Sequence, residues 1–381
     1  MNRGEGVHHR FYLGDALDVL TGLETGSADC MVTSPPYWNL RDYGTATWAG
    51  GDPACDHRPG KSPGMFTSAP GGGGSDFENL REVFSSWCEV CGARRLDRQV
   101  GIEATPEMYV TRLVGVFREA RRVLRPGRTF WLVVDDCYAR NGGTAGGGNR
   151  RLIQLEGVQK RMCGIPELHR YKPKDLLGIP WLLALSLRND GWYLRSDIIW
   201  RKTNCLPESV TDRPTREHEY LFRFSKSERY YYDADSIREP YAADSLARTR
   251  RGRGKKHKYS DGGPGNQSIA SDLSSACSNP LGRNRRTVWT VETRPFSDDH
   301  FATYPPDLIK PCVLAGCPPG GTVLDPFGGS GTTTLVAMAL GRHSIYIDLN
   351  PHYLEMALKR TGFKSGRLID CHTFEVIGHS A

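Results

Sequence analysis

A glycine-rich turn between a strand and a helix constrains the fold of this chain more than any other feature of its sequence. Residues 322–324 predict a strand, residues 325–333 (Asp-Pro-Phe-Gly-Gly-Ser-Gly-Thr-Thr) predict the turn, and residues 334–340 predict the helix that follows. Such a unit forms a ligand crevice at the carboxyl end of a parallel sheet. The sequence therefore predicts an α/β protein with a twisted, mostly parallel sheet flanked by helices.

Hydrophobic periodicity predicts the same alternation along the rest of the chain. Strands are expected at 11–13, 28–33, 129–134, 192–200, 219–224 and 344–347, and helices at 16–23, 106–124, 173–189, 304–314 and 351–360. In the second of these helices Thr105 is the expected N-cap, Met108 belongs to the expected apolar face, and Pro126-Gly127 is the expected stop. No apolar run approaches the roughly 18 residues that span a bilayer, which excludes a membrane-spanning class.

Three ligands could occupy the glycine-rich turn. A phosphate loop would need a lysine, but Thr332 follows Gly331. A dinucleotide, as in a nicotinamide dehydrogenase, would meet the negative charge of Asp325 beside its pyrophosphate. That charge suits the cationic S-adenosylmethionine, and Asp348, at the end of the next strand, could accept the hydroxyls of a ribose.

A second strand ends in Thr33-Ser34-Pro35-Pro36-Tyr37. Two successive prolines fix the backbone and remove two amide donors, so that the loop presents acceptors. The neighbouring tyrosine offers an aromatic face. Such a loop suits a flat group with an exocyclic amine; taken alone, it is equally typical of a surface turn.

The two junctions together resemble those of the amino-group DNA methyltransferases of the β motif order. In that family the catalytic motif precedes a basic recognition region and the cofactor motif comes last, as in this chain. The resemblance covers residues 8–140 and 172–362 and extends to phage-type members with a Cys/His insertion. It implies a Rossmann-like methyltransferase fold with insertions, and S-adenosylmethionine as the cofactor.

The resemblance also implies roles for individual residues. Residues 14–16 look like the contact with the cofactor's adenine, residues 300–314 look like the segment over its methionine, and Asp348 stands where the family more commonly has Glu. The expected catalytic residues are Ser34, Pro35, Pro36 and Tyr37. The expected cofactor-binding residues are Asp15, Ala16, Tyr304, Asp325, Phe327, Gly328, Gly329, Ser330, Gly331, Thr332 and Asp348.

Ser-Pro-Pro-Tyr is typical of cytosine-N4 enzymes, whereas Asp- or Asn-Pro-Pro-Tyr is typical of adenine-N6 enzymes, which remain the alternative. The implied mechanism is direct in-line transfer to a flipped base: Ser34 Oγ and the Pro35 carbonyl accept hydrogen bonds from the amine, and Tyr37 replaces lost stacking. Cytosine-C5 transfer would need a cysteine nucleophile. Pro311-Cys312 lies on an expected helix, so we interpret Cys312 as a core residue.

Basic residues are concentrated in one segment. Residues 245–286 hold ten Lys and Arg against two Asp, a surplus of +8, whereas the formal net charge of the whole chain is +7. Such a segment is either a solvated loop or an arm that contacts phosphates, and the two readings are compatible. The expected DNA-binding residues are Arg248, Arg250, Arg251, Arg253, Lys255, Lys256 and Lys258.

Four cysteine and histidine residues form two close pairs within residues 44–101. Cys55-x-His57 and Cys88-x-x-Cys91 match the ligand set of one structural zinc ion. The alternatives are an unliganded loop and a redox dithiol, although no thioredoxin-like strand–helix pattern surrounds the pair. With 11 cysteines, most of them isolated, a reducing compartment is expected.

These features predict five segments: 8–43 with the catalytic motif, 44–101 as the insertion, 102–202 as further methyltransferase core, 203–290 for target recognition and 291–370 for cofactor binding. The predicted function is site-specific methylation of double-stranded DNA in the cytoplasm of a prokaryotic cell, or by a phage-encoded enzyme. A restriction endonuclease partner and a monomeric or homodimeric state are the expected associations. The alternative of another class is a non-catalytic zinc-containing nucleic-acid-binding protein.

Overall fold

The computed structural model describes residues 7–38, 43–57, 88, 90–103, 105–139, 171–205, 207–244, 247, 279–293, 304–363, 367–370 and 373–378. A ten-stranded sheet forms its centre, in the order β11-β12-β1-β10-β9-β2-β5-β7-β6-β8. The central strands run parallel and are β1 (Val7–Leu13), β10 (His343–Asp348), β9 (Thr322–Asp325), β2 (Ala28–Thr33) and β5 (Leu124–Val134). The predicted α/β fold with a mostly parallel sheet is confirmed.

The flanking strands extend this sheet on both sides. They are β12 (Thr373–Gly378) and β11 (Arg367–Asp370) beyond β1, and β7 (His218–Ser225), β6 (Tyr193–Arg201) and β8 (Val288–Thr290) beyond β5. Because β7 runs antiparallel to β5, its first residues lie at the edge where the parallel strands end. That edge collects residues from distant parts of the sequence.

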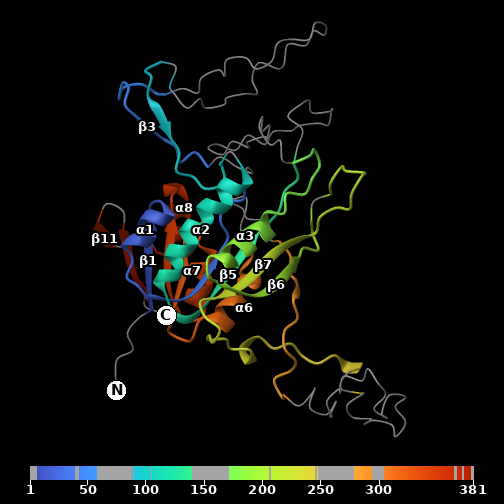
Figure 1. The fold of residues 1–381 in the computed structure, drawn as a ribbon. Helices are drawn as coiled ribbons and strands as arrows, with labels where there is room; N and C mark the ends of the chain where they lie inside the picture. Colours follow the sequence, from blue (N-terminus) through green and yellow to red (C-terminus); the bar gives the residue numbers. More distant parts are fainter. Residues whose placement is uncertain are drawn as a thin grey trace, which may run out of the picture.

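Helices cover both faces of the sheet (Figure 1). One face packs α1 (Ala16–Gly22), α2 (Pro106–Val123) and α3 (Ile179–Asn189) on side chains such as Phe130 and Leu132. The other packs α6 (Pro306–Gly316) and α7 (Thr332–Ala339) on Trp131 and Val133, and α8 (Pro351–Arg360) on Phe11 and Tyr346. Successive residues of β5 thus enter opposite cores, as a strand buried on both faces requires.

The helix at 106–124 begins as predicted and differs in its buried face. The Thr105 hydroxyl accepts a hydrogen bond from the Met108 amide at 3.2 Å, which caps the helix. The Met108 side chain is 56% exposed, whereas Tyr109 is fully buried in its place. Pro126-Gly127 does not end the helix, because β5 already begins at Leu124.

The helix at 173–189 begins later than predicted, at Ile179. The Asp136 carboxylate accepts hydrogen bonds from the amides of Gly178 and Ile179, at 3.0 and 3.1 Å. A cap supplied by the loop after β5 therefore sets the helix start, and Leu176 stays half exposed outside it. The leucine periodicity alone could not reveal that cap.

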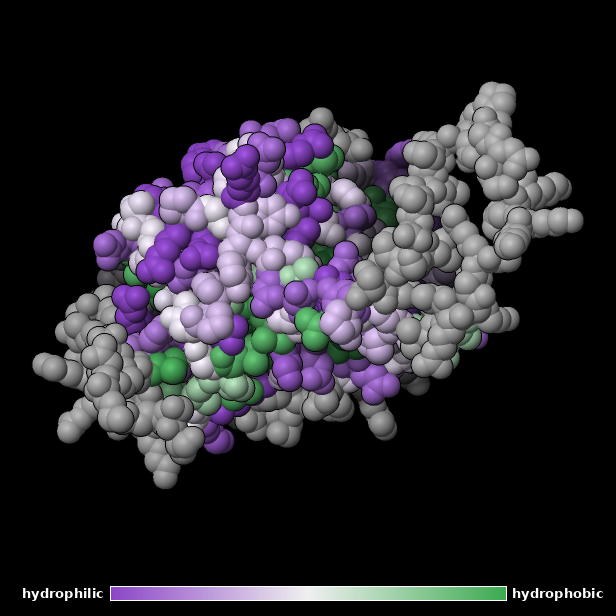
Figure 2. Space-filling model, turned by 90° about the horizontal axis from the view of Figure 1, so that it is seen from below, coloured by the Kyte–Doolittle hydropathy of each residue, from purple (hydrophilic) through white to green (hydrophobic). Residues whose placement is uncertain are grey.

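The segment at 44–101 contains the short antiparallel pair β3 (Thr47–Ala49) and β4 (Arg94–Leu96), which projects from the sheet at the top of Figure 1. The remaining described elements include the short 3-10 helix η1 (Asp235–Ile237). Seen from below, the molecule presents a largely hydrophilic surface (Figure 2). Within the described ranges, no helix has the length and apolarity needed to cross a membrane.

Candidate active site

The two predicted junctions meet in one pocket at the edge where the parallel strands end. Ser34, Pro35, Pro36 and Tyr37 follow β2 and line one part of it. The lining also includes most of the predicted cofactor-binding residues: Asp15, Ala16, Tyr304, Phe327, Gly328, Gly329, Ser330, Thr332 and Asp348. The pocket holds about 1010 Å³ of empty space including its open mouth, enough for a small-molecule site.

The glycine-rich turn is shaped by close backbone packing. A Cβ at position 328 would lie 2.2 Å from the ring of Tyr346, so only glycine fits there. The Tyr346 hydroxyl donates to the Gly329 carbonyl at 2.7 Å. Gly331 has φ +77° and packs against Ala357, where a Cβ would lie 2.8 Å away. Gly331 itself does not line the pocket; it shapes the turn that does.

Asp325 lies behind the pocket wall, only 1% exposed. Its carboxylate accepts hydrogen bonds from Thr33 Oγ1 at 2.6 Å, from the Tyr304 hydroxyl at 3.0 Å and from the Phe327 amide at 3.1 Å. Burial raises its pKa. Asp325 is not part of the pocket lining, and its hydrogen bond with Thr33 holds the turn against β2, next to Ser34. Its role in cofactor binding stays a prediction.

Asp348 faces the pocket from the end of β10. Its two carboxylate oxygens accept hydrogen bonds from the amides of Gly329 and Asn350, both at 2.8 Å. Desolvation raises its pKa to about 6. Its carbonyl accepts from the Gly14 amide at 2.9 Å, which brings the Gly14-Asp15 turn alongside. Asp15 caps α1 through its side chain, which accepts from the Leu17 amide at 2.9 Å.

Contacts with Tyr109 and Gly101 fix the backbone of the Ser-Pro-Pro-Tyr loop. The Pro36 carbonyl accepts from the Tyr109 hydroxyl at 2.9 Å, and Gly101 lies so close that a Cβ would come within 3.0 Å of the Tyr37 carbonyl. The Ser34 hydroxyl is directed at the Tyr37 hydroxyl, 3.5 Å away. The loop thus keeps its carbonyl and hydroxyl acceptors in one arrangement.

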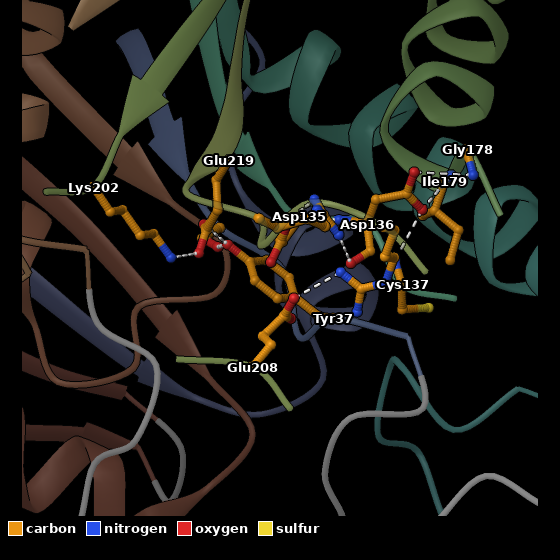
Figure 3. Close-up of polar contacts among 12 residues, drawn as sticks. Tyr37, Asp135, Asp136, Cys137, Gly178, Ile179, Lys202, Glu208 and Glu219 are labelled. Atoms are coloured by element: carbon orange, nitrogen blue, oxygen red, sulfur yellow. Dashed lines mark hydrogen bonds and ion pairs between the residues drawn. The ribbon is translucent and has the colours of Figure 1, made fainter. Parts of the chain in front are cut away.

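Tyr37 forms a hydrogen bond with Glu219, a residue that the sequence analysis did not identify. The Tyr37 hydroxyl donates to Glu219 Oε2 at 2.6 Å, and Glu219 also pairs with Lys202 (Figure 3). Burial, followed by the nearby Glu219 charge, raises the pKa of Tyr37 far above its usual value. The tyrosine therefore remains a neutral donor throughout the working pH range.

Asp135 completes this acidic group from the end of β5. Burial, and then the charge of Glu219, raise its pKa to about 6, and Arg216 forms an ion pair with it. Its position directly after the apolar run that ends at Val134 was the only signal available in the sequence. Glu219 opened a predicted strand, but nothing indicated that β7 would run antiparallel and bring it to this edge.

Comparison with models of protein families identifies the reaction for which this edge of the sheet is built. The family described as DNA methylase matches residues 28–359, which include both junctions. The chain belongs to this family. It is an S-adenosylmethionine-dependent DNA amino-methyltransferase of the N4/N6 group, so the predicted family and cofactor are confirmed. The dehydrogenase alternative is thereby excluded.

Two relatives of this DNA methylase match it along most of their length. It is 39% identical over 348 residues to the type II methyltransferase M.Cfr9I of Citrobacter freundii, covering 91% of this chain and 85% of that protein. It is 37% identical over 352 residues to the type II methyltransferase M.SmaI of Serratia marcescens, covering 92% and 90%. The solved PvuII DNA methyltransferase (cytosine-N4-specific) has a TM-score of 0.51 at 15% identity, covering 97% and 92%, which supports the Rossmann-like fold.

The pocket of the DNA methylase fits its cofactor. The bare backbone at Gly328 and Gly329 permits close approach, and the Asp348 carboxylate faces the same space. Cys312 is fully buried on α6, and its burial raises its pKa, so its interpretation as a core residue is confirmed.

One further predicted group is not part of the pocket lining. Cys55, His57, Cys88 and Cys91 come together in the insertion, with their ligand atoms all within 4.8 Å of one another. Residues 300–303 and the predicted DNA-binding residues Arg248, Arg250, Arg251, Arg253, Lys255, Lys256 and Lys258 lie outside the described ranges.

Proposed function

We propose that the enzyme is a type II methyltransferase that methylates the exocyclic N4 amine of cytosine in double-stranded DNA. The observation that carries this proposal is the hydroxyl of Ser34 at the head of the Pro-Pro-Tyr loop, where adenine-N6 enzymes typically have a carboxylate or a carboxamide. In line with the expectations above, it acts in the cytoplasm of a prokaryotic cell beside a restriction endonuclease.

Residues around the glycine-rich turn hold the cofactor, which supplies an electrophilic methyl group. Asp348 would accept hydrogen bonds from the ribose hydroxyls, and the Gly328–Gly329 backbone would allow the cofactor to approach closely. Asp15 and Ala16 would contact the adenine, and Tyr304 would contact the methionine part. Asp325 accepts hydrogen bonds from Thr33 and Tyr304 and thereby fixes the positions of β2 and of Tyr304 relative to the glycine-rich turn.

Ser34 and the Pro35 carbonyl accept hydrogen bonds from the amine of the flipped cytosine. Within the described part of the chain no hydrogen bond to the Pro35 carbonyl is found, and the Ser34 hydroxyl hydrogen is directed at Tyr37. Both oxygens are therefore available to accept from the amine, whose own lone pair is freed as the nitrogen becomes tetrahedral. Positioning supplies much of the rate.

The same hydrogen bonds provide a route for the proton that the methylated amine must lose. Ser34 donates to Tyr37 and Tyr37 donates to Glu219, so a proton received at Ser34 Oγ can be relayed to the Glu219 carboxylate. Lys202 holds Glu219 in place through their ion pair. The relay requires no covalent enzyme adduct.

Nucleoside analysis tests the proposed target base. DNA incubated with enzyme and S-adenosylmethionine, then digested and analysed by mass spectrometry, is expected to contain N4-methyldeoxycytidine. N6-methyldeoxyadenosine instead would contradict the cytosine assignment and favour the adenine-N6 alternative. A Ser34→Ala protein serves as the background control.

The affinity for S-adenosylmethionine is expected to fall at acidic pH. Because the pKa of Asp348 is raised to about 6, its carboxylate is ionised at pH 8 and largely protonated at pH 5. Affinity should therefore decrease by up to about tenfold for each pH unit below 6. Calorimetric titrations between pH 5 and 8 measure this dependence.

Protonation of Asp348 affects folding stability in the opposite direction from cofactor affinity. A carboxyl whose pKa is raised by folding stabilises the folded state as pH falls from about 6 towards its unfolded value, so loss of affinity at pH 5 is not explained by unfolding through Asp348. Asp348→Asn is the matched control and should bind weakly at every pH. A wild-type pH profile in this variant would remove Asp348 from the site.

DNA binding is expected to depend on the basic segment without regard to sequence. We propose that residues 203–290 contact the DNA and that the cations at 248–258 contact phosphates. Neutralising Arg250, Arg251, Lys255 and Lys256 together should make the log–log salt dependence of binding shallower by about two to four. Titrations across salt on cognate and scrambled duplexes should change alike; an unchanged slope with an altered site preference would instead identify a base-reading loop.

A further inference from the structure

The strongest unassigned feature is the cluster of Cys55, His57, Cys88 and Cys91 in the insertion. The Sγ atoms of Cys55 and Cys88 lie 3.7 Å apart, and Cys91 Sγ lies 3.3 Å from His57 Nδ1. All four ligand atoms lie within 4.8 Å of one another. A disulfide would hold its sulfur atoms about 2.05 Å apart, so Cys55 and Cys88 do not form a disulfide bond.

The 3.7 Å sulfur–sulfur and 3.3 Å sulfur–nitrogen distances are close to the edges of a tetrahedral zinc site. Zinc–sulfur bonds of about 2.3 Å and zinc–nitrogen bonds of about 2.0–2.1 Å give edges of about 3.8 Å between sulfurs and about 3.6 Å between sulfur and nitrogen. Three thiolates and one imidazole are a common closed set for a structural zinc ion. We propose that this cluster binds one zinc ion, which holds the wall of the cofactor pocket in place.

The chain around the cluster is folded to present these ligands. The Gly92 amide donates to the Cys88 carbonyl at 2.8 Å, and the Cys88 amide donates to the Ala93 carbonyl at 2.7 Å, which turns the Cys-x-x-Cys pair inward. Gly51 has φ +72°, and a Cβ there would lie 2.7 Å from Cys91 Sγ. The turn at Gly51, in the segment that contains Cys55, therefore leaves space for the sulfur of Cys91 in the other segment.

The cluster joins two segments that continue into the cofactor pocket. β3 and β4 pair only over Thr47–Ala49 and Arg94–Leu96, and few of the described insertion residues are buried. A pair of strands this short is not stable by itself. A zinc ion bound by both segments therefore holds them together, as a hydrophobic core does in a larger domain.

Below the strand pair the same two segments line the pocket. Tyr43 and Thr45 come from one, and Arg98, Gln99 and Val100 from the other. The Tyr43 amide donates to Gln99 Oε1 at 2.7 Å, and Arg112 donates to the Gln99 carbonyl at 2.8 Å. Separation of the two segments would move this wall, so zinc and S-adenosylmethionine should stabilise each other's binding.

Metal analysis tests the zinc site. Wild-type enzyme purified without chelator should contain about one zinc ion per chain, and so should Cys205→Ser, which removes a free cysteine outside the cluster. The Cys88→Ser/Cys91→Ser double variant should contain none. Zinc-free wild-type enzyme, or zinc retained in the double variant, would overturn the assignment.

Cobalt replacement gives a readout that does not depend on how the variants fold. Co²⁺ added to chelator-treated wild-type enzyme should produce thiolate-to-cobalt charge-transfer absorption, and added zinc should abolish it. Absence of that absorption would exclude a thiolate-rich site.

Calorimetry tests the role in the pocket. Zinc-depleted enzyme should bind S-adenosylmethionine about tenfold more weakly, and zinc addition should restore the affinity. Equal affinity with and without zinc would overturn the proposed support of the pocket wall.

Discussion

Ser34→Ala is expected to lower kcat about 100- to 1,000-fold while S-adenosylmethionine affinity remains that of the wild type. The Ser34 hydroxyl lines the pocket and directs its hydrogen at Tyr37, so its lone pairs remain to accept from the target amine. Alanine removes this acceptor and interrupts the relay to Glu219. The Pro35 carbonyl remains, so some activity should persist. Initial rates of labelled methyl transfer measure kcat, and calorimetry measures cofactor binding.

Ser27→Ala is the matched control for this substitution. Ser27 lies just before β2, at its other end, and its hydroxyl donates to the Glu24 carbonyl at 2.8 Å. Its kcat should remain close to that of the wild type. Wild-type activity in Ser34→Ala would remove Ser34 from the catalytic residues, and an equal loss of cofactor affinity would show a structural role.

The sequence was sufficient to predict the centre of the fold because those strands are buried on both faces. The near-continuous apolar run at Thr129–Val134 and the strand Ala28–Thr33 need no tertiary information to be recognised. The junctions that follow strands could be assigned to one pocket, since parallel strands end at the same edge. Ser34 and Gly328 were found in this way.

The remaining features depend on contacts between distant segments. Glu219 reaches Tyr37 only because β7 runs antiparallel to β5, and α3 begins at Ile179 because Asp136 caps it. Asp325 was placed among the cofactor-binding residues because its charge suits a cationic ligand. That its carboxylate is buried and accepts hydrogen bonds from the hydroxyls of Thr33 and Tyr304 could not be read from the sequence. Local pattern identifies a functional residue here and does not give the direction of its side chain.

Gly328→Ala is expected to weaken S-adenosylmethionine binding about 10- to 100-fold. The added Cβ would lie 2.2 Å from the Tyr346 ring, which is fully buried and bonded through its hydroxyl to Gly329. Either the ring or the turn must move, and such overpacking typically costs about 1–3 kcal/mol. Since Gly329 also bonds to Asp348, movement of the turn displaces the carboxylate that faces the cofactor. Calorimetry measures the affinity, and thermal unfolding measures stability.

Two further variants separate this cause from others. Gly115→Ala places a methyl group on α2 where nothing lies within 4 Å, so it should bind the cofactor normally and be no less stable than the wild type. Adding Tyr346→Leu to Gly328→Ala removes the ring that the Cβ meets and should recover part of the affinity. If the double variant binds no better than Gly328→Ala, the overlap with Tyr346 is not the cause. The glycine is then needed because the cofactor itself approaches its backbone, and any side chain at 328 would occupy that space.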